Sequence, residues 1–132
     1  AYILSIGGTV SFHREVAPWV FSGNKTLPND EFCHVAVTYD GAEMKIYVDG
    51  EFDAEQDRGA QNTDMVTPVL IGARFTNGTP SEFFKGILDE VAIFNVALTE
   101  DEILFVMEGL SSSKVVSPSG RLTTTWAGLK DE

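Results

Sequence analysis

The sequence has one cysteine, few basic residues and no long hydrophobic run. Cys33 has no second cysteine to pair with, so an internally disulfide-bonded scaffold is excluded. Nine basic residues stand against 20 acidic ones, which gives a net charge of −11. Nucleic acids and anionic membrane surfaces are recognised by clustered Lys and Arg, so neither is an expected partner. No apolar stretch is long enough for a membrane-spanning helix, so membrane insertion is not expected.

Motifs for catalysis and for transition-metal binding are also missing. His13 and His34 have no Cys or His at the spacing of a metal site. No glycine-rich phosphate loop is present, and no Ser, His and Asp arrangement can be argued from spacing. We therefore expect a protein that is not an enzyme.

What the sequence does contain is alternation of apolar and polar residues. His34 to Tyr39 and Glu43 to Val48 both alternate with period two, and each run ends in an Asp-Gly step. This pattern predicts two strands with one buried face. Asp-Gly tolerates the positive φ angles of tight turns, so the two runs are expected to form a β-hairpin.

The other predicted elements are short strands and one late helix. Strands are expected at Tyr2–Ile6, Thr9–His13, Trp19–Ser22, Val69–Ala73 and Phe83–Phe94, with an edge segment after Glu51 and a loop over Thr76–Ser81. The only convincing helix is Thr99 to Leu110, where Thr99 and Glu102 have the spacing of a capping box. This order predicts an all-β fold, an antiparallel β-sandwich with one short helix over residues 1–110. Residues 111–132 are expected to be a Ser-rich linker and a β-prone tail.

Two blocks carry a family likeness. They are EFCHVAVTYDGAEMKIYVDGE, from Glu31 to Glu51, and LIGARFTNGTPSEFFKGILDEVAIFNVALTEDEI, from Leu70 to Ile103. In order and spacing they resemble laminin G-like jelly-roll domains of the concanavalin A-like lectin and glucanase superfamily. The resemblance implies a jelly-roll sandwich and a role in recognition or cell adhesion.

Family domains usually have several dozen further residues on the amino side, with a Leu-x-Phe-Asp-Gly strand and an aromatic-Thr-x-x-x-Trp strand. This sequence has neither, so we expect an incomplete sandwich with an uncovered apolar face. Three covers are possible: a second copy in a homodimer, a completing partner chain, or the tail segment Leu122–Trp126.

Asp89 and Glu90 form the acidic pair of greatest interest. Neighbours in a strand point to opposite faces, so the two carboxylates are not expected to share a site. The resemblance implies a structural Ca²⁺ at Asp89, and the alternative is a carboxylate that accepts backbone hydrogen bonds. Laminarinase-type relatives use Glu-x-Asp-x-x-Glu on one strand, and the outer glutamates of that motif are absent here. An enzyme of this type is therefore not expected. A fragment of a polysaccharide-active enzyme is kept as the third hypothesis.

Exposed aromatic and polar side chains near loops are the candidate ligand contacts. Trp19 and Phe75 offer ring faces for a sugar, while Arg74 and Asn77 offer hydrogen bonds; core packing or loop anchoring is the alternative. The leading hypothesis is a non-catalytic module that binds glycan or protein and belongs to an extracellular or cell-surface protein of bacterial type. The second is an assembly module completed by self-association or by a partner chain.

Overall fold

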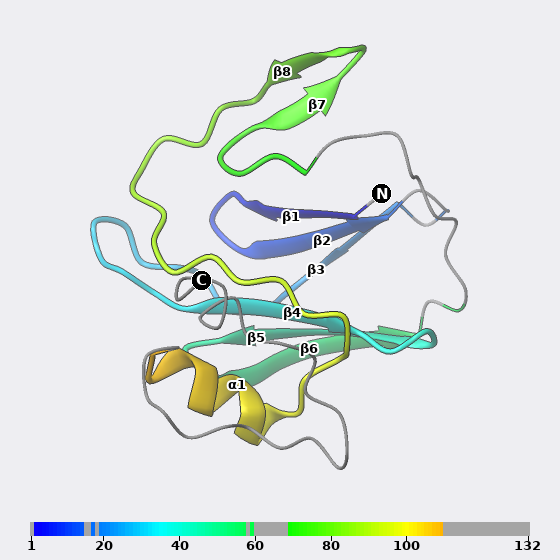
Figure 1. Cartoon of the computed structure of the whole chain (residues 1–132), viewed down its shortest axis with the longest axis vertical. Helices are drawn as coiled ribbons and strands as arrows, with labels where there is room; N and C mark the ends of the chain where they lie inside the picture. Colours follow the sequence, from blue (N-terminus) through cyan, green and yellow to red (C-terminus); the bar gives the residue numbers. More distant parts are fainter. Residues whose placement is uncertain (1, 15–16, 18, 58, 60–68, 110–132) are drawn as a thin grey trace, which may run out of the picture.

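The computed structural model describes residues 2–14, 17, 19–57, 59 and 69–109, and Figure 1 shows two three-stranded sheets that lie one above the other. The first sheet contains β1 (Tyr2–Ile6), β2 (Val10–Arg14) and β3 (Val20–Ser22), in the order β1-β2-β3. Every pairing is antiparallel, with Leu4 beside Phe12 and Phe12 beside Phe21. The predicted strands at Tyr2–Ile6 and Thr9–His13 are confirmed, the second shifted by one residue, and they form a hairpin around Gly7-Gly8.

The second sheet contains β4 (Val35–Tyr39), β5 (Glu43–Val48) and β6 (Glu51–Asp57), in the order β4-β5-β6. The predicted hairpin is confirmed, with Val37 beside Ile46. Asp40 closes its turn because its carboxylate accepts hydrogen bonds from the backbone N–H groups of Ala42 and Glu43, both at 2.8 Å. The second Asp-Gly step, Asp49-Gly50, has φ angles of 54° and 80° and turns the chain from β5 into β6.

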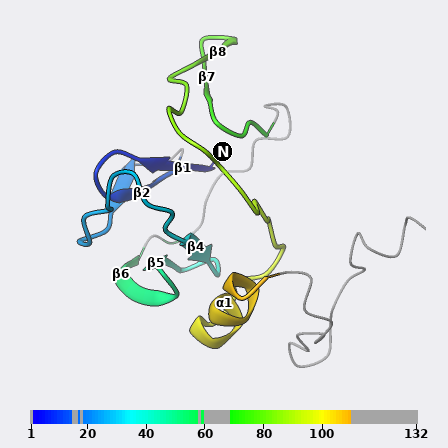
Figure 2. The same cartoon turned by 90° about the vertical axis from the view of Figure 1, so that its left-hand side faces the viewer.

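The hydrophobic core lies between the two sheets. Alternate residues of facing strands supply it: Val10, Phe12 and Phe21 from the first sheet, with Met44, Ile46, Val48 and Ala54 from the second, and Leu27 from a loop. Figure 2 shows the two layers edge-on. The period-two pattern therefore predicts the buried face of β5 correctly, because Met44, Ile46 and Val48 all point into this core.

A β-bulge ties the two sheets together at one side of the sandwich. Ile46 pairs with Ala54 while Tyr47 pairs with Phe52, so Asp53 is the extra residue on β6. Its carboxylate accepts hydrogen bonds from the backbone N–H groups of Asn24 and Lys25, both at 2.9 Å, in the loop that follows β3. β3 therefore lies over β6, and by sheet order β1 lies at the same side as β4.

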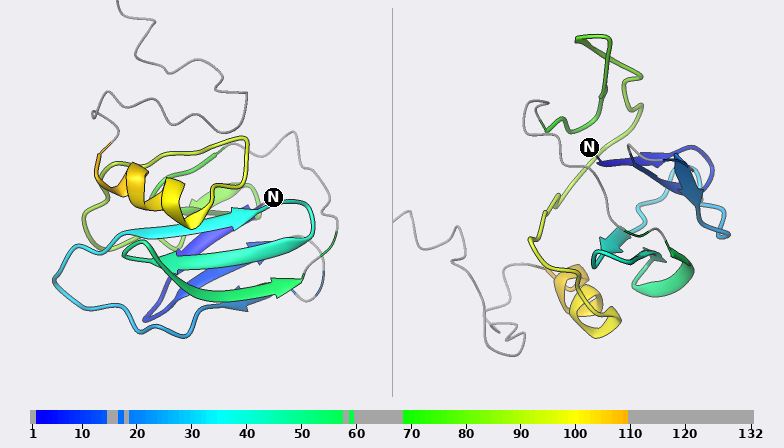
Figure 3. Two further views of the ribbon diagram at one scale, coloured as in Figure 1. Left: turned by 90° about the horizontal axis from the view of Figure 1, so that it is seen from below. Right: turned by 90° about the vertical axis from the view of Figure 1, so that its right-hand side faces the viewer.

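The helix α1 (Glu100–Met107) packs on the outer face of the second sheet, as Figure 3 shows from two further directions. The predicted capping box is confirmed: the Glu102 backbone N–H donates to Thr99 Oγ1, and the Thr99 backbone N–H donates to the Glu102 carboxylate. Ile103 is buried, and Leu104 and Met107 lie against Gly50.

One strand prediction and one loop prediction in the second half of the sequence are wrong. Val69–Ala73 is not a strand; the strand comes directly after it as β7 (Arg74–Thr76). The segment predicted as a loop, Thr76–Ser81, is the turn and second strand of a hairpin, with β8 at Thr79–Ser81. Asn77 and Gly78, with φ angles of 50° and 84°, form its tight turn. The strands on either side of this turn have three residues each, too few for an alternating pattern to reveal them.

The predicted long strand Phe83–Phe94 is also wrong. These residues cross from β8 to α1 without a strand assignment, and Glu90 has a φ angle of 48°, which interrupts an extended run. A strand needs a hydrogen-bonded neighbour, and none of the described strands pairs with this segment. The tail segment Leu122–Trp126, and with it the predicted linker and tail over 111–132, lies outside the described residues.

Candidate functional site

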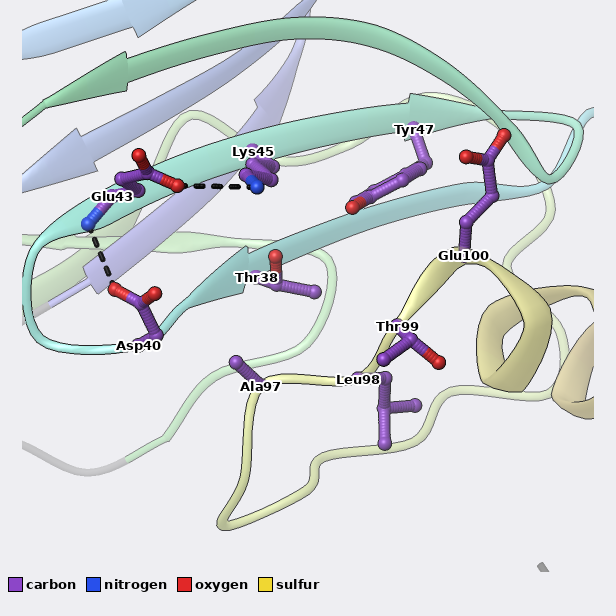
Figure 4. Close-up of a pocket in the computed structure, with 9 residues that line it drawn as sticks. All are labelled: Thr38, Asp40, Glu43, Lys45, Tyr47, Ala97, Leu98, Thr99 and Glu100. Atoms are coloured by element: carbon purple, nitrogen blue, oxygen red, sulfur yellow. Dashed lines mark hydrogen bonds and ion pairs between the residues drawn. The ribbon is translucent and has the colours of Figure 1, made fainter. Parts of the chain in front are cut away.

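A shallow, open cleft of about 350 Å³ lies on the outer face of the second sheet, between the β4–β5 hairpin and the start of α1. Nine residues line it: Thr38, Asp40, Glu43, Lys45, Tyr47, Ala97, Leu98, Thr99 and Glu100. Figure 4 shows that one wall comes from the hairpin and the other from the segment that leads into α1.

Strand alternation places the polar residues of the hairpin wall. Glu43, Lys45 and Tyr47 are alternate residues of β5, so they point to the face opposite the buried Met44 and Ile46. Thr38 on β4 lies directly beside Lys45 in the register. The same pattern that predicts the core therefore also predicts that these side chains share the outer face. The sequence does not reveal that α1 returns to form the second wall.

Charged groups of both signs are fixed in the cleft. Lys45 Nζ lies 3.1 Å from a Glu43 carboxylate oxygen and 3.6 Å from a Glu55 carboxylate oxygen, and its hydrogen bond with Glu43 raises the pKa of Lys45. The backbone N–H groups of Glu43 and Ala42 lower the pKa of Asp40. Both groups are therefore charged at neutral pH.

The far end of the cleft combines an aromatic ring with the helix start. Tyr47 is buried at its base and makes an edge-to-face contact with Phe52, with ring centroids 6.0 Å apart. Glu100 reaches the same strand pair, because its carboxylate accepts a hydrogen bond of 3.3 Å from the Phe52 backbone N–H. These contacts fix the position of α1 against β5 and β6, so the two walls of the cleft are held at a set distance.

The residues predicted as ligand contacts do not line this cleft. Arg74, Phe75 and Asn77 all belong to the β7–β8 hairpin, and Arg74 Nη1 forms an ion pair of 3.3 Å with Glu82. Trp19 is 61% exposed and directly precedes β3. Arg74 and Glu82 influence the pKa of His13, which pairs with Val20. The structure therefore brings the hairpin near the outer face of the first sheet, and the ligand role of these four residues stays a prediction.

Asp89 is exposed and accepts a hydrogen bond of 2.9 Å from the Glu90 backbone N–H. Within the described part of the chain, no group of three or more His, Cys, Asp or Glu side chains is arranged to hold a metal ion. Ca²⁺ prefers several oxygen ligands, and Asp89 is the one carboxylate that is predicted as a ligand. A Ca²⁺ site at Asp89 stays a prediction.

His34 is a second titratable group with an unusual environment. Its Nδ1 atom is buried and has no hydrogen-bond partner among the residues that the structure describes. Burial lowers the pKa of His34 from its ordinary value of 6.5, while the Asp49 and Glu90 carboxylates act in the opposite direction. The folded protein therefore resists protonation of this ring more than the unfolded chain does.

This difference predicts acid sensitivity. Stability associated with neutral His34 is present above the unfolded pKa near 6.5 and is lost as pH falls below it toward the folded pKa. We expect the urea midpoint to fall between about pH 7 and pH 5, and to fall less in His34→Gln. Because burial also lowers the pKa of His13, His13→Gln serves as a parallel variant. An unchanged slope in His34→Gln would contradict this assignment.

Two stacked antiparallel sheets with a helix on one outer face define the class of jelly-roll-type sandwich domains. The model of a laminin G-type family, described as the concanavalin A-like lectin/glucanases superfamily, matches residues 4–104. The chain belongs to this family, as the two sequence blocks indicated.

The fold is also similar to a solved structure. This is the 2.1 Å crystal structure of residues 221–444 of an S-layer domain-containing protein from Clostridium thermocellum, with a TM-score of 0.55 and 22% identity. The match covers 75% of this chain and 51% of that one, so the chain spans about half the length of that structure. A search of curated proteins finds no match. Among the described residues, no helix is long and apolar enough to cross a membrane.

Proposed function

We propose that this domain is a non-catalytic recognition module of an extracellular or cell-surface protein and that it binds a glycan in the cleft between the β4–β5 hairpin and α1. The observation that carries the proposal is the composition of this cleft. It offers the hydroxyl groups of Thr38 and Thr99, fixed carboxylates, one ammonium group and an aromatic ring at its base. Sugar hydroxyls both donate and accept hydrogen bonds, and charged partners strengthen such bonds.

The charges in the cleft favour a particular class of glycan. Asp40, Glu43 and Glu100 carry three negative charges, against one positive charge on Lys45. The chain as a whole has a net charge of −11. Sulfated or uronic acid-rich glycans are therefore disfavoured, and neutral or amino-bearing sugars are the expected ligands.

Two observations support glycan binding rather than glycan hydrolysis. The cleft is open to solvent, whereas catalysis of glycoside hydrolysis is favoured by a site that excludes water. A general acid must also hold a proton near neutral pH, whereas two backbone N–H groups lower the pKa of Asp40. A surface location is consistent with the family and with the S-layer protein that shares this fold.

The test is a glycan array followed by calorimetry with the best neutral hit. We expect Glu43→Gln to weaken binding about tenfold, because a hydrogen bond to a charged group contributes about 1.5–3 kcal/mol. Glu82→Gln, which removes a carboxylate from the distant β7–β8 hairpin, is the matched control and should bind normally. Absence of any neutral or amino-bearing hit, or equal losses in both variants, would contradict the proposal.

A further inference from the structure

One side of the sandwich has two unprotected edge strands. β4 and β1 are the edges on this side, and their sequences, Val35–Tyr39 and Tyr2–Ile6, contain no charged residue, no proline and no glycine. Natural sheets usually protect exposed edges with charges, proline or bulges. Such protection is present on the opposite side, where β6 carries four acidic residues and the bulge at Asp53.

Every second residue of β4 directs its backbone N–H and C=O groups toward this open side. The Asp49 N–H donates to the His34 carbonyl and the Asp40 N–H donates to the Glu43 carbonyl. Hydrogen-bonded pairs alternate along an antiparallel ladder, so Ala36 and Thr38 also bond to β5. The backbone groups of Val35 and Val37 therefore point away from β5, and the strand order of the described residues places no strand beside them.

Apolar side chains on the same side are incompletely covered. Leu4 and Ile6 alternate with Ile3 and Ser5, so they share the inner face of the first sheet with Phe12 and Val10, yet they are 43% and 38% exposed. The crossing segment from residue 83 to residue 98 also runs along this side (Figures 1 and 3). It carries exposed Ile87, Val91, Ile93, Phe94 and Val96. Exposed apolar side chains gathered on one side of a domain are typical of an interaction site.

Acidic groups lie at both ends of the β4 edge. Asp40 follows β4 directly. At the other end, the Asp49 carboxylate accepts a hydrogen bond of 3.0 Å from the His34 N–H and forms an ion pair of 3.8 Å with Lys25, while Glu90 lies close enough to His34 to influence its pKa. A second copy of this chain would bring a further charge of −11 to this surface. An occupant with cationic ends would instead complement both ends of the edge.

We propose that the open side of the sandwich receives an extended β-segment of a partner protein, apolar at alternate positions and cationic at its ends, which adds to β4 as a further strand. Main-chain hydrogen bonds to Val35 and Val37 supply affinity, and the exposed apolar side chains accept the alternate side chains of the added strand. This site shares Asp40 with the cleft, but it uses the outward backbone of β4 and does not depend on glycan binding.

The test uses the full chain and the synthetic peptide Lys-Val-Thr-Val-Thr-Val-Lys as the probe. We expect the peptide to slow amide hydrogen exchange at Val35 and Val37, whereas Ala36 and Thr38, already bonded to β5, should change little. A matched peptide with Glu in place of both Lys residues should bind about tenfold more weakly. Val37→Pro should abolish binding because it removes an outward N–H without breaking the ladder to β5. Val37→Thr keeps that N–H and should bind.

Three results would overturn the proposal. They are unchanged exchange at Val35 and Val37, equal binding of the two peptides, or strong protection of Val35 and Val37 before any peptide is added. The last result would mean that a second copy or another part of this chain already occupies the edge. Because the exchange pattern is read in the unaltered protein, the test stands even if Val37→Pro does not fold.

Discussion

Ile46→Ala is expected to destabilise the domain by about 2–5 kcal/mol. Ile46 is fully buried at the centre of β5, and it belongs to the cluster that joins the two sheets. The substitution removes three methyl or methylene groups and leaves a cavity that its neighbours fill only in part. Domains of this size have a total stability of only about 5–15 kcal/mol, so the loss is a large share of it.

The measurement is urea unfolding followed by far-ultraviolet circular dichroism. Val69→Ala is the matched control, because Val69 is 75% exposed and should contribute little. We expect a clear drop in the midpoint for Ile46→Ala and almost none for the control. Similar midpoints in both variants would mean that the core does not lie between the two sheets.

Gly50→Ala is expected to have the second largest effect, about 2–3 kcal/mol of destabilisation. Gly50 has a φ angle of 80°, which costs an L-residue energy wherever it occurs. In addition, a Cβ atom at this position would lie 2.3 Å from Leu104 Cδ2 and 3.2 Å from Leu104 Cγ. Leu104 would have to leave its present side-chain conformation, or α1 would have to shift, to relieve this contact.

Gly41→Ala separates the two contributions. Gly41 also has a positive φ angle, 106°, but a Cβ atom there would meet nothing within 4 Å. Gly41→Ala should therefore show the backbone cost alone, and the excess in Gly50→Ala measures the contact with α1. Because α1 forms one wall of the cleft, Gly50→Ala should also weaken glycan binding. Equal destabilisation in the two variants would contradict the packing of α1 on the β5–β6 turn.

The first half of the fold and the start of α1 could be predicted from sequence because their signals are local. Two Asp-Gly turns flank an alternating strand, and the Thr99–Glu102 capping box marks the helix start within four residues. These features depend on φ preferences and short-range hydrogen bonds, which the sequence specifies directly. The core residues Met44, Ile46 and Val48 follow from the same alternation.

The segment between residues 69 and 98 could not be predicted in this way, because strand formation there depends on pairing with other strands. Residues 83–94 are apolar enough to suggest a strand, but none of the described strands pairs with them. The cleft was missed for a related reason: Thr38 and Tyr47 meet Thr99 and Glu100 only because α1 returns to the sheet. The approach of Leu104 to Gly50 also depends on this return of α1.

The two proposed binding sites lie on different surfaces of the sandwich. The cleft lies on the outer face of the second sheet, whereas the open side lies along the edges of β4 and β1. Thr38 contributes its side chain to the cleft, while its neighbour Val37 presents its backbone to the open side. Asp40 borders both surfaces, so the two ligands meet at this residue.

The most direct test of the recognition function is a nuclear magnetic resonance titration with the best neutral oligosaccharide from the array, in which protein and sugar signals are followed together. We predict chemical-shift changes centred on Thr38, Lys45, Tyr47 and Thr99, with the sugar recovered intact. Changes centred on Arg74 and Asn77 instead, or cleavage of the sugar, would contradict the account.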